Sequence, residues 1–291
     1  MKIGAVALMA SVTLLLSGCF GGLTEAQQQD HKAWMEWRSD NDNAARDPNR
    51  SFLNIRDATY LQTGESAWLL STATAEQIRW RERSEGLDFG LTHRGERADI
   101  VWHHSSHQLE AGQSIELSER LLVSVGDLYN GGMRAFIRDK RHPLLASFAG
   151  YQFFPYNGDA KVLAQFTPTE ATPVLFQTVQ GLTNRFYRIG LLNFDWQGQQ
   201  ITMPAYHSKP QPPFDSLILF FKDHTNGEQT YGGGRELYLE LTQPLSQPIA
   251  IDFNYSVNFY CARSTFWNCP ILRDPPLSVA ITAGETYHKT P

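Results

Sequence analysis

The sequence predicts a mainly β protein, either an antiparallel β-sandwich or a partly closed barrel, with an amphipathic helix at its N-terminus. From Trp68 onward apolar and polar residues alternate, as at Leu121, Val123 and Val125, and this period of two is typical of half-buried strands. Turn-forming pairs such as Asn157-Gly158 separate the alternating segments, as they do in hairpins. About a dozen or more short strands and one convincing helix therefore favour a sandwich or barrel.

The composition indicates a chain that can form a large core. Of its 291 residues, 42% are hydrophobic and 7 are Trp, so a disordered chain is excluded. The formal net charge of −5 disfavours a nucleic-acid partner, because phosphates attract basic surfaces. The only long apolar run is at the N-terminus, which excludes a protein with several membrane spans.

The N-terminus has the features of a bacterial lipoprotein signal. Lys2 precedes an apolar run of about 14 residues, which is short for a membrane-spanning helix and typical of a secretory signal. The next residues, Leu16-Ser17-Gly18-Cys19, resemble a lipobox, in which the cysteine thiol is diacylglycerated and becomes the new N-terminus. An uncleaved anchor helix, or an ordinary signal peptide followed by a chance cysteine, is the alternative.

Processing at Cys19 would define the domains and the location of the protein. Residues 1–18 are then the signal peptide, residues 19–24 a lipid-anchored tether, and residues 25–291 a single large mainly β domain with a motif-rich C-terminal part, 215–291. A two-lobed body is the alternative. The acyl chains would anchor the protein in a membrane of the bacterial cell envelope, facing the periplasm. No Asp follows the cysteine, which favours the outer membrane.

A helix is the first element expected after the tether. Thr24 and Gln27 have the spacing of a capping box, and Trp34 and Trp37 follow at helical spacing. We expect this Trp face to pack on the protein body. The helix is expected to end before the polar segment 41–49, which contains Asp-Pro-Asn and is predicted to be a loop.

Two cysteines remain for the folded part, Cys261 and Cys269. An oxidising envelope permits a disulfide between them, and closing so short a loop adds roughly 2–3 kcal/mol of stability. Two buried free thiols, a redox pair or two metal ligands are the alternatives. The spacing matches neither a C-x-x-C redox motif nor a zinc knuckle.

Polar residues that could bind a ligand gather in the last third of the chain. Three glycines precede Arg235, and glycines inside a strand mark a bend, a tight crossing or a backbone that approaches a ligand. Their N–H groups and the guanidinium could hold an anion, while Tyr231 could stack or donate. A structural alternative pairs Arg235 with Asp223 or Asp252 as cross-bracing. The candidate ligand-binding residues are Asp223, Thr225, Tyr231, Gly232, Gly233, Gly234, Arg235, Asp252, Asn254 and Glu285.

Short motifs in the middle and at the end of the chain also suggest a family. They are Arg138-Asp139, Phe148-Ala149-Gly150, Phe154-Pro155, Thr230 to Arg235, Asp252-Phe253-Asn254, Cys261, Cys269-Pro270 and Ala283-Gly284-Glu285. Together they resemble the bacterial domain-of-unknown-function family 1684. The chain departs from its pattern at Phe259-Tyr260, where a Pro pair is usual, and at Arg273-Asp274, which interrupt a Pro-rich stretch. The activity of that family is uncharacterised, so the resemblance implies membership and no mechanism.

These features predict a non-catalytic periplasmic module that binds a small polar or anionic ligand. One alternative is a hydrolase-type enzyme that uses Asp223, Asp252 and Glu285 for acid–base chemistry, and another is a purely structural envelope component. No G-x-S-x-G motif is present. We expect no cofactor and no metal site. The cluster of His103, His104 and His107 is expected at a solvated strand end.

Overall fold

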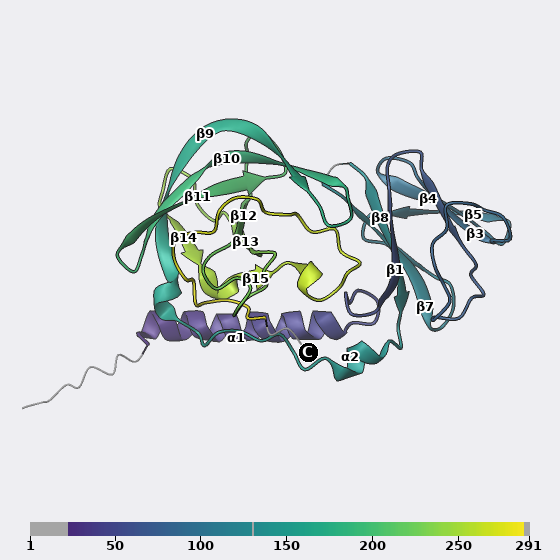
Figure 1. Ribbon diagram of the computed structural model, residues 1–291, viewed down its shortest axis with the longest axis horizontal. Coiled ribbons are helices and arrows are strands. Elements are labelled where there is room, and N and C mark those ends of the chain that lie inside the picture. The colour runs from purple at the N-terminus through teal and green to yellow at the C-terminus, as the bar shows by residue number, and fades with distance from the viewer. Residues whose placement is uncertain (1–22, 130, 288–291) are drawn as a thin grey trace, which may run out of the picture.

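The computed structural model describes residues 23–129 and 131–287. The chain forms two β lobes that lie side by side, and the N-terminal helix runs along the base of the larger lobe (Figure 1). The prediction of a mainly β, antiparallel fold with an N-terminal helix is confirmed. The predicted signal peptide, residues 1–18, and the predicted lipidation site, Cys19, lie outside the described residues.

Helix α1 (Glu25–Arg46) begins with the predicted capping box. The Thr24 hydroxyl accepts a hydrogen bond from the N–H of Gln27 at 3.2 Å. The Gln27 side-chain oxygen accepts one from the N–H of Thr24 at 2.9 Å. These two bonds satisfy N–H groups that a helix start otherwise leaves without partners.

The predicted loop over residues 41–49 is wrong in its first part, because α1 continues to Arg46. Tertiary contacts stabilise the extra turn. The Asp42 carboxylate accepts a hydrogen bond from the N–H of Tyr151 at 2.9 Å, and Ala45 is buried. The helix then ends just before Pro48, since a proline disfavours helical geometry in the residue that precedes it.

The first lobe is a sandwich of two four-stranded antiparallel sheets, with orders β1-β8-β7-β6 and β2-β3-β4-β5. Alternate residues of both sheets fill the space between them, among them the fully buried Leu91, Ile100, Val123 and Ile137. The strands are β1 (Ile55–Leu61), β2 (Ser66–Leu69), β3 (Phe89–His93), β4 (Arg97–Trp102), β5 (Ser105–Glu110), β6 (Ser114–Glu116), β7 (Leu121–Asp127) and β8 (Met133–Asp139).

The second lobe is built on a seven-stranded antiparallel sheet with the order β14-β9-β10-β11-β12-β13-β15. Its first two strands in sequence are long and arch over the rest of the lobe (Figure 1). The strands are β9 (Lys161–Gln177), β10 (Thr183–Trp196), β11 (Gln199–His207), β12 (Ser216–Phe221), β13 (Arg235–Glu240), β14 (Ile249–Asp252) and β15 (Val257–Asn258). The short helices are α2 (Pro143–Ser147), η1 (Gly158–Ala160), η2 (Phe253–Tyr255) and η3 (Tyr260–Ala262).

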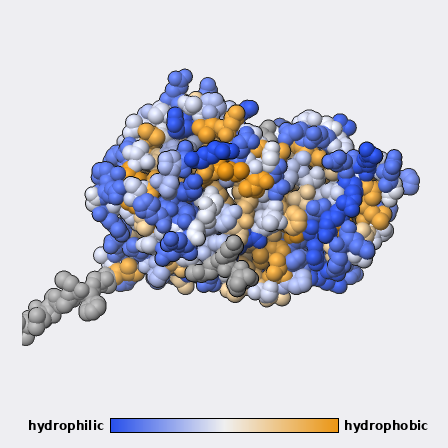
Figure 2. All heavy atoms as spheres, viewed as in Figure 1, coloured by the Kyte–Doolittle hydropathy of each residue, from blue (hydrophilic) through white to orange (hydrophobic). Residues whose placement is uncertain are grey.

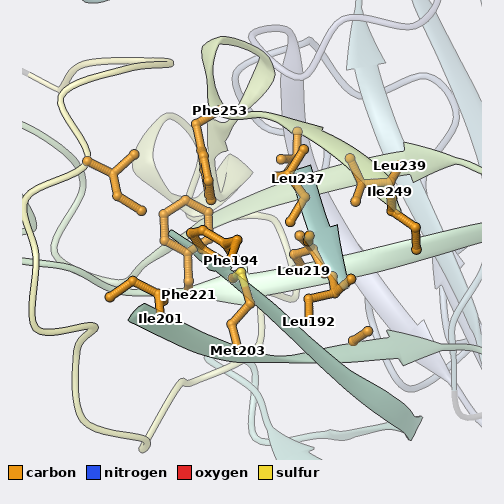
Figure 3. Close-up of a cluster of buried hydrophobic side chains, with 14 of the residues drawn as sticks. Leu192, Phe194, Ile201, Met203, Leu219, Phe221, Leu237, Leu239, Ile249 and Phe253 are labelled. Atoms are coloured by element: carbon orange, nitrogen blue, oxygen red, sulfur yellow. The ribbon is translucent and has the colours of Figure 1, made fainter. Parts of the chain in front are cut away.

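The seven-stranded sheet has two different faces. One face carries the main core of the lobe, where the side chains of Leu219, Phe221 and Phe253 lie close together (Figure 3). Because successive side chains of a strand point to opposite faces, the residues between these core positions point the other way. On β12, Phe220 is one of them, and it belongs to a separate aromatic cluster.

Trp34 fastens α1 to the larger lobe. Its side chain is buried, and its indole N–H donates to the carbonyl oxygen of Asn254 at 2.8 Å. Trp37, one turn later, meets Tyr255 with ring centroids 4.9 Å apart. The Trp face of the helix therefore packs on the body. No helix among the described residues combines the length and the apolar composition needed to cross a membrane.

We expect Trp34→Ala to lower the free energy of unfolding by about 3–5 kcal/mol, because it removes a buried ring and leaves the Asn254 carbonyl without its donor. Met35 is a matched control, because it is the next residue on the helix and is 50% exposed. Met35→Ala should change stability by less than about 0.5 kcal/mol. Urea unfolding of both variants measures the difference, and equal losses would contradict this account of how α1 is attached.

Candidate functional site

A cavity of about 980 Å³ lies between the two lobes. Its floor is the sheet face that points away from the main core and includes Phe186 and Phe220. The hairpin between β7 and β8 forms one wall, the segment 260–270 forms another, and residues of α1 close one end. On the face shown in Figure 2, hydrophilic residues dominate and hydrophobic residues form several patches, one of them in the middle of the molecule. Ligands often bind in cavities at such junctions.

Glu236 faces this cavity from β13. Its strand neighbours Arg235 and Leu237 are buried on the core side, so Glu236 points to the other face, where its cross-strand neighbour is Phe220. Protein surrounds the side chain, which keeps accessible surface because it lines the cavity. Within the described part of the chain, its carboxylate has no hydrogen-bond donor and no cation as partner. Burial raises the pKa of Glu236 to about 7, and the charge of Glu285 acts in the same direction.

Arg134 of β8 brings a positive charge to the cavity from the other lobe. Its Nη1 donates to the carbonyl oxygen of Asp127 at 2.6 Å, and its guanidinium carbon lies 5.3 Å from the ring centroid of Trp267. No carboxylate of the described residues lies within ion-pair distance of Arg134. Burial lowers the pKa of Arg134, because desolvation disfavours the charged form. A guanidinium remains protonated at neutral pH, so this is an unpaired cation.

Two tyrosines lie within the electrostatic reach of both charges. Burial raises the pKa of Tyr129 and of Tyr260, the charge of Glu236 raises both further, and the charge of Arg134 lowers both. Tyr129 is 57% exposed and Tyr260 43% exposed, and both line the cavity. The charges of Glu236 and Arg134 therefore both reach these two rings, and all four side chains line the cavity.

Glu285 lines the cavity too, but both of its carboxylate oxygens are engaged. Oε2 accepts a hydrogen bond from the backbone N–H of Asn258 at 2.8 Å, and Oε1 accepts one from Nε of Arg263 at 3.2 Å. Burial raises the pKa of Glu285, whereas the Arg263 charge lowers it. The carboxylate is thus held in place. The third cation of the cavity, Lys161, is likewise paired, with Asp30 at 2.6 Å.

A disulfide between Cys261 and Cys269 closes the wall formed by residues 260–270, as predicted. Trp267 of this wall stacks on Tyr260 with ring centroids 4.7 Å apart. Among the described residues, no partner is present for the indole N–H of Trp267 or for the side-chain oxygen of Asn268. Both side chains line the cavity, but these two atoms are themselves buried.

Of the ten candidates predicted from the sequence, Asp252 and Glu285 line the cavity. Asp252 accepts the N–H of Asn254 at 3.0 Å, at the start of η2, and burial raises its pKa. The others are not among the lining residues and lie elsewhere in the lobe. They are Asp223, Thr225, Tyr231, Gly232, Gly233, Gly234, Arg235 and Asn254.

Arg235 lies in a buried polar cluster on the core side of β13. It forms an ion pair with Asp223, and both side chains are 0% exposed. Its Nη1 donates to the carbonyl oxygen of Ala283 at 2.6 Å, and its Nη2 to that of Ile281 at 3.0 Å. The other Asp223 oxygen accepts the N–H of Thr225 at 2.7 Å. Arg235 therefore forms the ion pair of the structural alternative, and its partner is Asp223 rather than Asp252.

Gly234 allows a tight crossing next to this cluster. Its φ is +122°, and a Cβ atom here would lie 2.8 Å from a methyl of Leu272 and 3.2 Å from the carbonyl oxygen of Phe221. Only glycine fits such a position without strain. Nearby, Tyr231 is half-buried and its N–H donates to the Asn258 side chain at 3.0 Å.

The histidine cluster lies in the first lobe, at the turn between β4 and β5. His103 and His104 have φ values of 48° and 62°, as the two central residues of a tight hairpin turn require. Both are exposed, as is His107 on β5. Within residues 23–129 and 131–287, no group of three His, Cys, Asp or Glu side chains is placed to hold a metal ion.

Glu236 and Arg134 were missed from the sequence. Each is a polar residue in an alternating strand, between Arg235 and Leu237 in one case and between Met133 and Ala135 in the other. Alternation indicates that both face away from a core. It does not show that another lobe covers that face and turns it into a cavity.

Comparison with known proteins identifies a family but no activity. A family model described as "Protein of unknown function (DUF1684)" matches residues 146–286. The chain is also similar to an uncharacterised protein of Haloarcula marismortui with a solution NMR structure. The two are 32% identical, the match covers 48% of this chain and 78% of that one, and the TM-score is 0.42. No curated protein matches the chain.

We expect Arg235→Met to lower the free energy of unfolding by about 3–5 kcal/mol, because Asp223 would stay buried without its cation. Arg97 is a matched control, because its ion pair with Asp99 at 3.3 Å is largely exposed. Arg97→Met should cost less than about 1 kcal/mol. Adding Asp223→Asn to Arg235→Met should restore part of the lost stability. Chemical unfolding of the variants checks this order, and similar losses for Arg235→Met and Arg97→Met would refute it.

Proposed function

Because this chain belongs, through residues 146–286, to the DUF1684 family of proteins of unknown function, we propose a function from its cavity. The protein is a lipid-anchored component of the bacterial cell envelope that binds a small organic anion between its two lobes. The ligand combines an anionic group with an apolar or aromatic body.

Arg134 is the observation that carries this proposal. A guanidinium that lines a cavity without a carboxylate partner offers a planar fork of donors to a carboxylate, phosphate or sulfonate. Tyr129, Tyr260 and Trp267 add aromatic surface beside it, suited to a ring or chain of the ligand. A volume of about 980 Å³ accommodates a small organic molecule.

The same geometry favours binding over the hydrolase alternative. General acid–base catalysis needs titratable groups that reach the substrate. Asp223 is enclosed with Arg235 and has no exposed side-chain surface. Glu285 has both carboxylate oxygens engaged, by Asn258 and Arg263. Of the three predicted carboxylates, only Asp252 keeps a free edge, so the proposed acid–base set does not act together.

The envelope location rests on the N-terminal sequence. The lipobox-like Leu16-Ser17-Gly18-Cys19 precedes α1 closely, since the helix begins at Glu25. A diacylglyceryl group on Cys19 would hold the folded body at a membrane surface, most simply the outer membrane facing the periplasm. A disulfide between Cys261 and Cys269 is compatible with an oxidising compartment of this kind.

We expect the full chain to bind 2-naphthalenesulfonate, a ring system with a permanently ionised group, as measured by isothermal titration calorimetry. Arg134→Gln should weaken this affinity at least about tenfold, because it removes the charged donor of the complex. Arg134→Lys should retain part of the affinity, since the charge stays and the fork is lost.

Arg185 supplies the matched control for this experiment, because it is an exposed arginine on β10 of the same sheet and does not line the cavity. Arg185→Gln should leave the affinity unchanged. Near-UV circular dichroism shows whether each variant keeps its fold. A folded Arg134→Gln protein that binds the probe as well as the unsubstituted chain would remove the basis of the proposal.

We expect the mature protein from bacterial cells to carry a fatty-acyl label and to fractionate with membranes. Cys19→Ser should abolish both, because the serine hydroxyl does not replace the thiol in the modification. Cys261→Ser is the control that removes a different thiol, and it should leave labelling intact. Mass spectrometry that finds an unmodified chain beginning at Met1 would exclude the anchor.

A further inference from the structure

We propose that Gly126 positions the Arg134 guanidinium, so that the ligand is bound edge-on by the Nε and Nη2 donors. The anionic group then accepts two parallel hydrogen bonds, as a carboxylate, sulfonate or phosphate can. Gly126 does not line the cavity and therefore acts through Arg134. This inference rests on the proposed function and specifies how that site recognises its ligand.

Arg134 and Gly126 lie opposite each other in the first lobe. They pair across strands β8 and β7, so side chains at these two positions share one face of the sheet. A Cβ atom at Gly126 would lie 2.8 Å from Nη2, 2.9 Å from Cζ and 3.1 Å from Nε of Arg134. Since the distance to Cζ falls between the distances to its two nitrogens, a flat face of the guanidinium, rather than an edge, lies against the glycine. Any larger residue at this position would occupy the same space.

The second lobe covers the guanidinium through Trp267. Cζ of Arg134 lies over the Trp267 ring, 5.3 Å from its centroid. The same ring meets Phe136 at 5.3 Å between centroids, and Phe136 shares a sheet face with Arg134 because the two are two residues apart on β8. On the neighbouring strand β1, Tyr60 lies opposite Arg134 and donates its hydroxyl hydrogen to the carbonyl oxygen of Phe266. The wall formed by residues 260–270 therefore packs on the sheet face that carries the guanidinium.

One edge of the guanidinium is left for a ligand. Nη1 donates to the carbonyl oxygen of Asp127 at 2.6 Å. Within residues 23–129 and 131–287, Nε and Nη2 of Arg134 have no hydrogen-bond acceptor. These two N–H groups are parallel, and together they match two oxygens of one anionic group. The flat faces are occupied by the strand backbone and by Trp267, so the ligand meets the Nε–Nη2 edge.

The contact with Gly126 fixes the guanidinium before a ligand arrives. A free arginine side chain has many rotamers, and a ligand that must select one of them binds less tightly. Alanine would fit the backbone here, because the φ angle of Gly126 lies outside the left-handed region. The three atoms nearest to its Cβ would all belong to the far end of Arg134. Gly126→Ala therefore displaces the guanidinium, while the charge and the strand remain.

The first test is isothermal titration calorimetry of the full chain with 2-naphthalenesulfonate. Gly126→Ala should weaken the affinity at least about tenfold, because the methyl group moves Nε and Nη2 away from the two ligand oxygens. In Arg134→Gln, adding Gly126→Ala should change the affinity by less than about twofold, because no guanidinium remains to be positioned. A glycine that only supports the fold would affect binding equally in both backgrounds.

NMR of the unsubstituted chain tests the edge-on contact without any change at Gly126. In a sample with isotope-labelled arginine, the Nε–H resonance of Arg134 is the one that Arg134→Gln removes. This resonance should shift downfield when the probe binds, because Nε–H gains a charged acceptor. An Nε–H resonance that stays in place while the probe binds overturns the edge-on contact.

Gly232→Ala is the matched control, because Gly232 is an exposed glycine outside the cavity and an added Cβ atom would lie 3.6 Å from its nearest neighbour. It should leave the affinity unchanged, and near-UV circular dichroism shows whether each variant keeps its fold. Full affinity in a folded Gly126→Ala protein, or an equal loss with and without Arg134, overturns this inference and leaves the Arg134 site standing. Failure of the unsubstituted chain to bind the probe overturns the site and the inference together.

Discussion

The buried ion pair between Arg235 and Asp223 organises the cavity, although neither residue lines it. Its guanidinium also donates to the carbonyl oxygens of Ile281 and Ala283, and so holds the C-terminal segment against β13. A cation in a protein core needs such acceptors, because an uncompensated buried charge is costly. Glu285 follows in the same segment and therefore reaches the cavity at a fixed position. Because strand residues alternate, burying Arg235 also fixes Glu236 on the opposite face.

Two carboxylates thus reach one cavity in different environments. Glu285 has a cation and a backbone donor as partners, whereas Glu236 has neither among the described residues. Proteins usually pair buried charges, so a desolvated carboxylate without a partner works against stability. Such exceptions gather at functional sites, where the group is kept available for a ligand. Arg134, which lines the same cavity, is a cation without a carboxylate partner among the described residues.

Local patterns in the sequence predicted the start of helix α1, alternating strands and one disulfide bond. Thr24 and Gln27 predicted the start of α1, and the alternation from Leu121 to Val125 predicted β7. The end of α1 was misjudged because contacts of Asp42 and Ala45, distant in sequence, stabilise its last turns. The pairing of Cys261 with Cys269 was predicted from compartment and parity.

The site was harder to predict because it depends on which surfaces meet. Polar residues near glycines pointed to Arg235 as a ligand-binding residue, yet Arg235 pairs with Asp223 inside the lobe and stabilises the fold. Glu236 looked like an ordinary solvent-facing residue of an amphipathic strand. Its place in a cavity is visible only once the hairpin that carries Tyr129 and Arg134 is placed over the same sheet face. A pattern of period two reports the side of a sheet and carries no information about what covers that side.

The two lobes supply different charged groups to the cavity. The family match over residues 146–286 includes Glu236, Arg263 and Glu285, and it excludes Tyr129 and Arg134. The matched part supplies four lining carboxylates, Glu236, Glu240, Asp252 and Glu285, and two cations that are already paired, Lys161 and Arg263. By itself it would attract cations or neutral donors. The first lobe adds the unpaired cation, Arg134. If the cavity binds an anion, this preference comes from a hairpin outside the matched region, and the same sheet face could serve a different ligand wherever that hairpin differs.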